Sequence, residues 1–193
     1  MDVTKYPENG EHICFLIFAF LQADCRDSYL QQELFSLGKD FNIIRDKNSD
    51  SRTAYVDNEG IESDGHLDES ISLPLDDILP LVELQGDHAV AAALWDVAQG
   101  LRTIADQFED RVVNQATRDL RSRIEKSLPE QWAQLLKHEV TRMMNQGLGM
   151  ENFAQERVIM ACTFTLVKGV CKQAPHLLRN LFEAALQFVW CGA

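Results

Sequence analysis

The first apolar segments of the chain predict two helices. Residues from Ile13 to Ala23 are apolar on nearly every face, which is typical of a helix that is buried on most sides. The second helix begins at Ser28–Gln31, a capping box in which the Ser and Gln side chains satisfy the first amide groups. Its apolar positions continue to Leu37, and Gly38 is the predicted C-cap.

Periodicity is lost between residues 42 and 86. This segment is acidic, rich in Asp, Ser, Asn and Gly, and contains Pro74 and Pro80. Its composition predicts a flexible, disordered loop with at most one short helix near residues 75–84. Loops of this length are unusual inside a compact domain unless they serve a function, so we expect a regulatory role for it.

Helical periodicity returns at about Asp87. It predicts five further helices, at about 87–108, 112–124, 127–147, 152–173 and 177–190. A second capping box at Ser127–Glu130 is expected to open the third of these, and Pro175 to open the last. No segment alternates as a strand does. The sequence therefore predicts an all-α bundle in which residues 1–193 form one domain around two central apolar helices.

Charge is distributed unevenly along the chain. The net charge of -12 excludes a general nucleic-acid binder, because contact with phosphates needs Lys and Arg. From Arg45 to Asp87 there are 12 acidic and 3 basic residues, whereas from His88 to Ala193 there are 11 acidic and 12 basic residues. The acidity is concentrated in the predicted loop, so the rest of the chain is able to approach an anionic membrane.

Cysteine usage and hydropathy indicate a cytosolic protein. The five cysteines are odd in number, form no CxxC motif and follow no signal peptide, so reduced and mostly buried thiols are expected. No apolar stretch approaches the roughly 20 residues that a membrane-spanning helix needs. We therefore expect a protein that is made in soluble form.

A stripe of apolar residues predicts a helix that binds a groove. Leu94, Val97, Leu101, Ile104 and Phe108 follow spacings of three and four residues and share one helix face. Such anchors fill pockets in the hydrophobic groove of a partner, where small Ala105 allows close approach and Asp106 is placed to pair with an Arg. The alternative is an ordinary amphipathic helix that packs only in its own bundle.

The acidic loop contains a candidate protease site. Proteases that cut after Asp need an extended, accessible chain, and initiator caspases and granzyme B favour the residue types that precede Asp64. The candidate residues are Ile61, Glu62, Ser63, Asp64 and Gly65. The alternative is a simple Asp-Gly turn.

The last two predicted helices contain an unusually apolar pair of segments, 158–170 and 177–189. Residues Val158–Val167 include no charged side chain and span about 15 Å as a helix, roughly half the thickness of a bilayer core. In the soluble protein they are expected to form buried core helices. A second hypothesis is that this hairpin inserts into a membrane, or lies on one, after rearrangement.

Motifs of enzymes, metal sites and cofactors are absent from the sequence. The five histidines are scattered, and no HExxH, zinc-finger spacing, P-loop or GxSxG is present. No nucleophile has a base at a useful spacing. We therefore expect a protein that is not an enzyme and needs no metal or cofactor.

Several segments resemble the death agonists of the Bcl-2 family that carry only the Bcl-2 homology 3 motif. Leu101 and Asp106 match the two most characteristic positions of that motif, with Ala105 where Gly is commoner. Asp64 and Gly65 stand where these proteins are cut. Further similar segments are Phe18–Gln22, Glu33-Leu34 followed by Leu37-Gly38, and Pro175–Arg179 with Phe182.

The resemblance covers most of the chain and implies a Bcl-2-like helical bundle. It implies a cytoplasmic protein that a caspase or granzyme B cuts after Asp64, whose fragment 65–193 then moves to the mitochondrial outer membrane. Residues 90–112, the homology 3 helix, are expected to engage pro- and anti-apoptotic Bcl-2 relatives and to promote membrane permeabilisation and cytochrome c release. The family's last helix is expected to be missing, because this chain stops at Ala193.

Two other functions are compatible with the same sequence. A multi-motif Bcl-2 protein would offer its own groove to such helices, but Trp95, Trp132 and Trp190 do not stand in the Asn-Trp-Gly-Arg context of those proteins. A membrane-permeabilising protein would act through the apolar hairpin alone. It would leak liposomes without a Bcl-2 partner and would tolerate Leu101→Ala.

Overall fold

The computed structural model describes residues 8–23, 25–43, 88–146 and 152–192, and the regular structure within these ranges is helical. The α-helices are α1 (Glu8–Gln22), α2 (Ser28–Asp40), α3 (His88–Ala105), α4 (Asp110–Ile124), α5 (Trp132–Asn145), α6 (Gln155–Gln173) and α7 (Leu178–Gly192). Single 3-10 turns at Pro129–Gln131 and Pro175–Leu177 lead into α5 and α7. The predicted all-α class is confirmed.

The two apolar helices expected at the centre, α6 and α7, form the middle of the bundle. α6 packs against α3, α4, α5 and α7, and its charge-free segment is buried almost throughout. Within that segment, the hydroxyls of Thr163 and Thr165 donate to carbonyls four residues earlier, so they need no outside partner. The central position covers this segment on all faces, as a segment without charged side chains requires.

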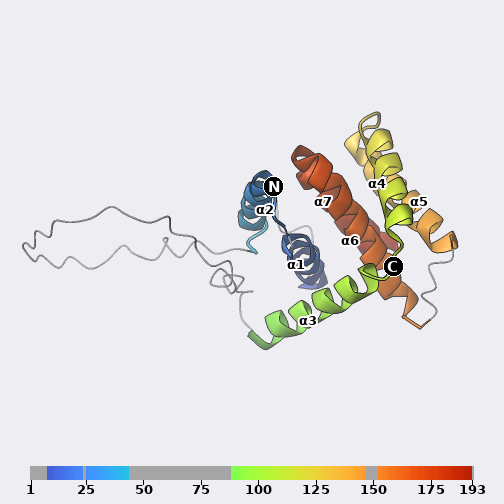
Figure 1. Cartoon of the computed structure of the whole chain (residues 1–193). Coiled ribbons are helices and arrows are strands. Elements are labelled where there is room, and N and C mark those ends of the chain that lie inside the picture. The colour runs from blue at the N-terminus through green and yellow to red at the C-terminus, as the bar shows by residue number, and fades with distance from the viewer. Residues whose placement is uncertain (1–7, 24, 44–87, 147–151, 193) are drawn as a thin grey trace, which may run out of the picture.

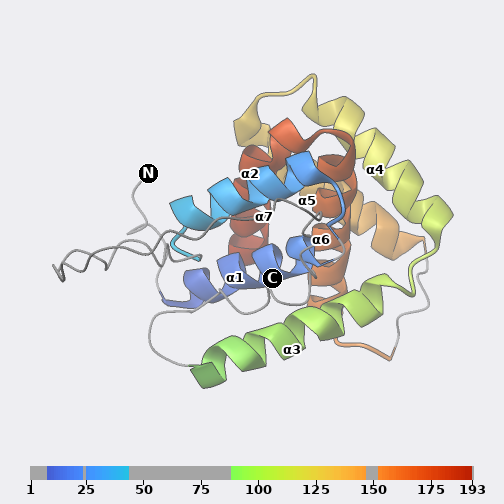
Figure 2. The ribbon, with the colours of Figure 1, turned by 60° about the vertical axis from the view of Figure 1, so that its left-hand side comes forward.

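The first helix is as thoroughly buried as the central pair. Every side chain from Cys14 to Leu21 is buried, as expected for a segment that is apolar all round. α1 packs against α3 on one side and against α7, α2 and α6 on others. In Figures 1 and 2, α1 and α3 lie side by side, and α2 lies across the bundle next to α7.

The ends of α2 differ from the sequence prediction. The N-cap is Asp27, whose carboxylate accepts from the Leu30 amide at 2.8 Å, and not the predicted capping box that opens at Ser28. Gly38 lies buried inside the helix and is not its C-cap. The chain instead leaves the helix through Asn42, whose φ of 55° is left-handed, a conformation that Asn tolerates better than most residues. A short polar side chain before and after the helix thus marks its true limits.

The second predicted capping box is also wrong. No side chain caps the turn that begins at Pro129, and its N-cap is Leu128. The backbone carbonyl of Ser127 accepts from the indole N–H of Trp132 at 3.3 Å. Burial of Trp132 requires a partner for that N–H, so the segment is shaped by the buried indole and not by a capping side chain.

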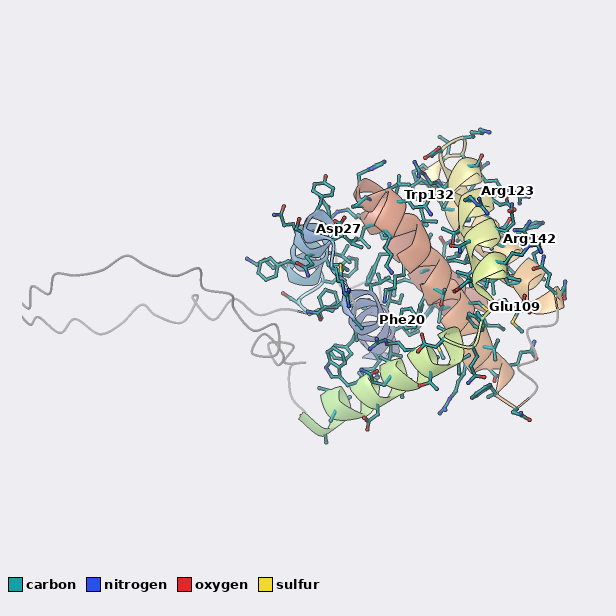
Figure 3. The ribbon with its side chains drawn as sticks, viewed as in Figure 1. Phe20, Asp27, Glu109, Arg123, Trp132 and Arg142 are labelled. Carbon is teal, nitrogen blue, oxygen red and sulfur yellow. The ribbon has the colours of Figure 1, made fainter. Side chains whose placement is uncertain are left out.

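A cluster of charged side chains joins α4 to α5, and we call Asp119, Arg123, Glu139 and Arg142 the ionic seam. Figure 3 labels Arg123 and Arg142. Glu139 is fully buried, and its carboxylate lies 2.8 Å from Nη2 of Arg142 and 3.3 Å from Nη1 of Arg123. Nη1 of Arg142 also contacts Asp119 at 2.8 Å. Within the described residues the Glu139 oxygens accept no directed hydrogen bond, so the two guanidinium charges compensate its burial.

Candidate protein-interaction helix

α3 is the candidate interaction helix, and its sequence is well suited to the conformation. Its first half is rich in Ala, the strongest helix former, and the helix continues for 18 residues from His88 to Ala105. It runs along the outside of the bundle, where α1 and α6 cover one of its faces (Figure 1). The opposite face, including Gln99 and Thr103, is exposed.

The predicted anchors lie together on the covered face. Leu101 is 1% exposed, Ile104 2% and Phe108 5%. Leu94 and Val97 are half-buried and pack against the same core. The stripe is therefore part of the core of this bundle, so no partner can reach its central anchors while α3 stays in place.

Residues outside the predicted stripe also bind α3 to the bundle. Trp95 stacks edge-to-face on Phe15 of α1, with ring centroids 5.9 Å apart. Ala91 and Ala98 are buried as well. With Leu94, Leu101, Ala105 and Phe108, these two alanines make a second stripe with spacings of three and four. Small apolar residues at heptad spacing are the sequence signal for this second stripe, and a pattern of large apolar side chains alone does not include them.

The segment 90–112, expected to be one helix, is divided in this structure. α3 ends at Ala105, the next residues form a turn, and α4 begins at Asp110. The amides of Asp106, Gln107 and Phe108 donate to Arg102, Ile104 and Ala105, which tightens the chain into this turn. Phe108 is buried at the end of this turn, and Glu109 then takes an extended conformation.

Asp106 and Ala105 lie at this turn. Asp106 is exposed, as expected for a residue that is to pair with a charge on a partner, whereas Ala105 is half-buried. The candidate site therefore combines an accessible carboxylate with anchors that are turned inward. A partner would meet Asp106 first and would reach Leu101 only after α3 had moved.

The candidate protease site lies outside the described residues. This applies to Ile61, Glu62, Ser63, Asp64 and Gly65, and to residues 44–86 of the expected loop. The last described residue before it is Ile43, and α3 begins after it at His88. The connection between α2 and α3 therefore contains the whole candidate site.

Two further observations concern the chemistry of the described residues. No helix among them is both long enough and apolar enough to cross a membrane. No group of three or more His, Cys, Asp and Glu side chains among them is arranged to hold a metal ion.

Comparison with known proteins gives one result. A family model described as BH3 interacting domain (BID) matches residues 7–191, which is nearly the whole chain. No curated protein and no solved structure matches it.

Proposed function

Because the chain belongs to the BH3 interacting domain (BID) family, we propose that α3 is the homology 3 helix through which this Bcl-2-family apoptotic protein engages the grooves of its pro- and anti-apoptotic relatives. The observation that carries the proposal is the stripe of Leu94, Val97, Leu101, Ile104 and Phe108 beside exposed Asp106. Each anchor buried in a groove contributes about 1.5–3 kcal/mol before ordering costs. The role is that of a binding protein and not of an enzyme.

Burial of the stripe supports a latent resting state. Leu101 and Ile104 are buried, and α1 and α6 are the helices that pack against α3, so the same side chains that would fill a groove are already in use. The packed bundle and the groove therefore compete for one helix face. Binding requires α3 to exchange its contacts, and anything that weakens the cover provided by α1 favours that exchange.

Cleavage after Asp64 is the proposed trigger. α1 and α2 precede this bond and α3 follows it, so the cut ends the covalent connection between α3 and the helix that covers it. The fragments 1–64 and 65–193 first remain together through the buried contacts of α1. An initiator caspase or granzyme B is the proposed protease, because both favour the residues from Ile61 to Asp64.

The fragment 65–193 is proposed to act at the mitochondrial outer membrane. The intact protein resides in the cytoplasm, where the acidic loop and the buried apolar helices keep it soluble. After the cut, 17 acidic and 12 basic residues remain in the larger fragment, compared with 13 and 6 in the smaller. The fragment that contains α3 then promotes permeabilisation and cytochrome c release through its Bcl-2 partners.

Binding of a peptide tests the central claim. A peptide of residues 90–112 is titrated into purified Bcl-2-family grooves, beside peptides that carry Leu101→Ala or Asp106→Ala. Submicromolar binding is expected, and each substitution should weaken it at least about tenfold, since one lost anchor or ion pair costs about 1.4 kcal/mol or more. Thr103→Ala is the matched control, because Thr103 is exposed on the opposite face.

Three outcomes would overturn the assignment. A peptide that binds no groove would leave the stripe as core packing alone. Saturable binding of other homology 3 peptides to the whole protein would favour the multi-motif alternative, in which this chain supplies the groove. Liposome leakage that survives Leu101→Ala without any partner would favour the membrane-permeabilising alternative.

The trigger is tested separately on the full chain. Asp64→Glu keeps the charge but lengthens the side chain, so a protease with an Asp-specific pocket should no longer cut at this bond. Release of cytochrome c from isolated mitochondria is measured with wild type and variant after protease treatment. Cutting of the variant at residue 64 would contradict the proposed site, whereas the peptide result would stand.

A further inference from the structure

Lys168 of α6 contacts the C-terminal end of α1. Its ammonium donates to the Ala23 carbonyl at 2.6 Å and lies 5.6 Å from the centre of the Phe20 ring. Phe20, labelled in Figure 3, also packs edge-to-face on Phe164, with ring centroids 5.5 Å apart. Phe164 precedes Lys168 by one helical turn, so both residues share one face of α6. One face of α6 therefore binds both a ring and a carbonyl at the end of α1.

The end of α1 lacks a positive charge of its own. The last carbonyls of a helix have no amide donor within it and form the negative end of its dipole. The last turn of α1 contains no basic residue. The chain turns just beyond it, where the Cys25 amide donates to the Gln22 carbonyl at 3.2 Å and the Gln31 side chain donates to the Cys25 carbonyl at 2.5 Å. Those two bonds are local, whereas the donor to Ala23 comes from α6.

The other charged contact between α2 and the C-terminal helices is more exposed. Asp40 at the end of α2 pairs with Arg179 of α7, and their side chains are 50% and 41% exposed. Solvent screens such a pair, so it contributes little to the attachment. Phe41 and Phe182 pack nearby, with ring centroids 5.0 Å apart. Half-buried Lys168 is therefore the better shielded of the two polar connections.

We propose that Lys168 caps the end of α1 from α6 and thereby slows the release of the N-terminal fragment. The inference rests on the proposed function, because Phe20 and Ala23 belong to the fragment 1–64 and Lys168 to the fragment 65–193. The buried apolar side chains of α1 supply most of the attachment, and the Lys168 cap sets how long it lasts after the cut. Since α1 packs against α3, loss of the cap gives a partner earlier access to Leu101.

Hydrogen exchange of the intact chain tests the cap without a protease. Lys168→Met keeps an unbranched apolar side chain of similar length but removes the ammonium. Amides at the end of α1, such as that of Ala23, which donates to the Ala19 carbonyl, should exchange at least about tenfold faster, as expected when a hydrogen bond to a charged group is lost. The amides of α4 and α5 should keep their wild-type rates.

Lys172→Met is the matched control, because it removes the same charge from an exposed position one turn further along α6. This variant should exchange as wild type does. Wild-type exchange at the end of α1 in Lys168→Met would overturn the proposal. Faster exchange throughout the bundle in that variant, or equal acceleration by Lys172→Met, would also overturn it, since general stability or net charge would then explain the effect.

The release rate is measured after cleavage. Wild type and variants are cut with granzyme B and held in mild denaturant, and the fraction of free fragment 1–64 is followed with time on a sizing column. Lys168→Met should release it at least about tenfold faster than wild type, whereas Lys172→Met should not. Arg179→Gln should change the rate less than Lys168→Met does, because its pair is exposed.

The two measurements separate the proposed cap from the proposed trigger. Equal release from wild type and Lys168→Met would contradict the cap even where the cut occurs as expected. Failure of the protease to cut would count against the trigger alone, and the exchange of the intact chain would then decide whether Lys168 holds the end of α1.

Discussion

α3 and α5 both lie on the outside of the α6–α7 pair, but different forces hold them there. α3 packs against α1 and α6, buries Leu101 and Ile104, and places Trp95 in an edge-to-face contact with Phe15 of α1. α5 also buries apolar side chains, and it is joined to α4 by the ionic seam around Glu139. The buried contacts that hold α3 are apolar, whereas α5 combines apolar contacts with a buried charge in a fixed position.

This difference indicates which helix is free to change partners. Apolar burial is non-directional, so a hydrophobic groove can replace the contacts of α3 with little loss. A buried carboxylate that loses its partners pays the full cost of desolvation, so separating α5 from α4 is strongly opposed. The bundle therefore favours release of α3 while α4 and α5 stay together. Substitutions in the two regions should respond differently to partners, salt and pH.

The largest expected effect comes from Leu101→Ala. Removing this fully covered side chain should lower the free energy of unfolding by about 2–5 kcal/mol, because a cavity is left in the core. Leu136→Ala on α5 is the matched control, since Leu136 is equally buried. Urea denaturation should show similar losses for both variants. In peptide titrations only the Leu101 change should weaken groove binding.

This pair of variants can contradict the proposed difference between α3 and α5. If the Leu101 variant is as stable as wild type, α3 is not held by its anchors and the latent state needs another cause. If both variants are destabilised but the Leu101 peptide still binds normally, the bundle and the groove do not compete for the same side chains.

A smaller effect is expected from Arg142→Ala. The substitution leaves Arg123 as the only guanidinium beside buried Glu139, next to the His138 ring at 3.6 Å, and removes the ion-pair partner of Asp119. We expect a loss of about 1–3 kcal/mol, reduced from the value for a wholly buried pair because the Arg142 side chain is a third exposed. Added salt should narrow the gap to wild type, since it screens the exposed part of the pair.

The effect of salt on the loss of stability should differ between the α3 and α5 variants. The gap caused by Leu101→Ala should be insensitive to salt, because the lost contact is apolar. Lys137→Ala, an exposed change on α5, controls for the loss of a positive charge. A Lys137 variant that loses as much stability as the Arg142 variant would show that net charge, and not the ionic seam, is responsible.

Gly169→Ala tests how tightly α4 is held against α6. A Cβ added at Gly169 would lie 2.6 Å from Oγ1 of Thr117, so the Thr117 side chain or one of the two helices must shift. Overpacking of this kind costs about 1–3 kcal/mol. Gly100→Ala is the matched control, because a Cβ there meets nothing within 4 Å and should stabilise the helix by about 0.5–1 kcal/mol.

Circular dichroism during thermal unfolding measures both glycine variants. A lower melting temperature for Gly169→Ala and a higher one for Gly100→Ala would place the rigid contact between α4 and α6. Equal shifts in the same direction would mean that helix propensity, and not close approach, decides both results.

The sequence predicted the helices better than their ends. Apolar periodicity determines a long helix, so α1, α3, α6 and α7 appear where expected. Ends depend on single polar groups and on tertiary contacts. The N-cap of α2 is Asp27 and not the predicted Ser28. At the other end the left-handed residue is Asn42, whereas Gly38, the predicted C-cap, lies inside the helix. The apolar spacing continues to Phe108, but α3 ends at Ala105 and α4 begins at Asp110, so the spacing does not report this division.

For the candidate site too, the sequence predicted the residues but not the contacts that depend on the fold. The anchors of α3 were predictable from spacing, but the direction they face was not, since an anchor for a groove and a core residue obey one periodicity. The ionic seam was harder still. Glu139 and Arg142 are three residues apart on one helix, but Arg123 reaches Glu139 from α4, so only the fold brings them together.

The smallest expected effect is the pH dependence of the stabilisation that the ionic seam provides. A hydrogen bond from Gln115 and then the Arg142 pair hold the pKa of Asp119 below its ordinary value of 3.8. Because the folded pKa is depressed, the stabilisation is present above that value and is lost as pH falls through the folded pKa. The difference in unfolding free energy between wild type and Asp119→Asn should therefore shrink on acidification below pH 3.8.

The corresponding difference for Leu101→Ala should stay constant over the same range. Since Asp119 and Arg142 are both about a third exposed, the change should not exceed about 1 kcal/mol. Parallel curves for the two variants would mean that the charges of α4 and α5 contribute no more specifically than the apolar contacts of α3, and the distinction between a fixed and an exchangeable helix would have to be abandoned.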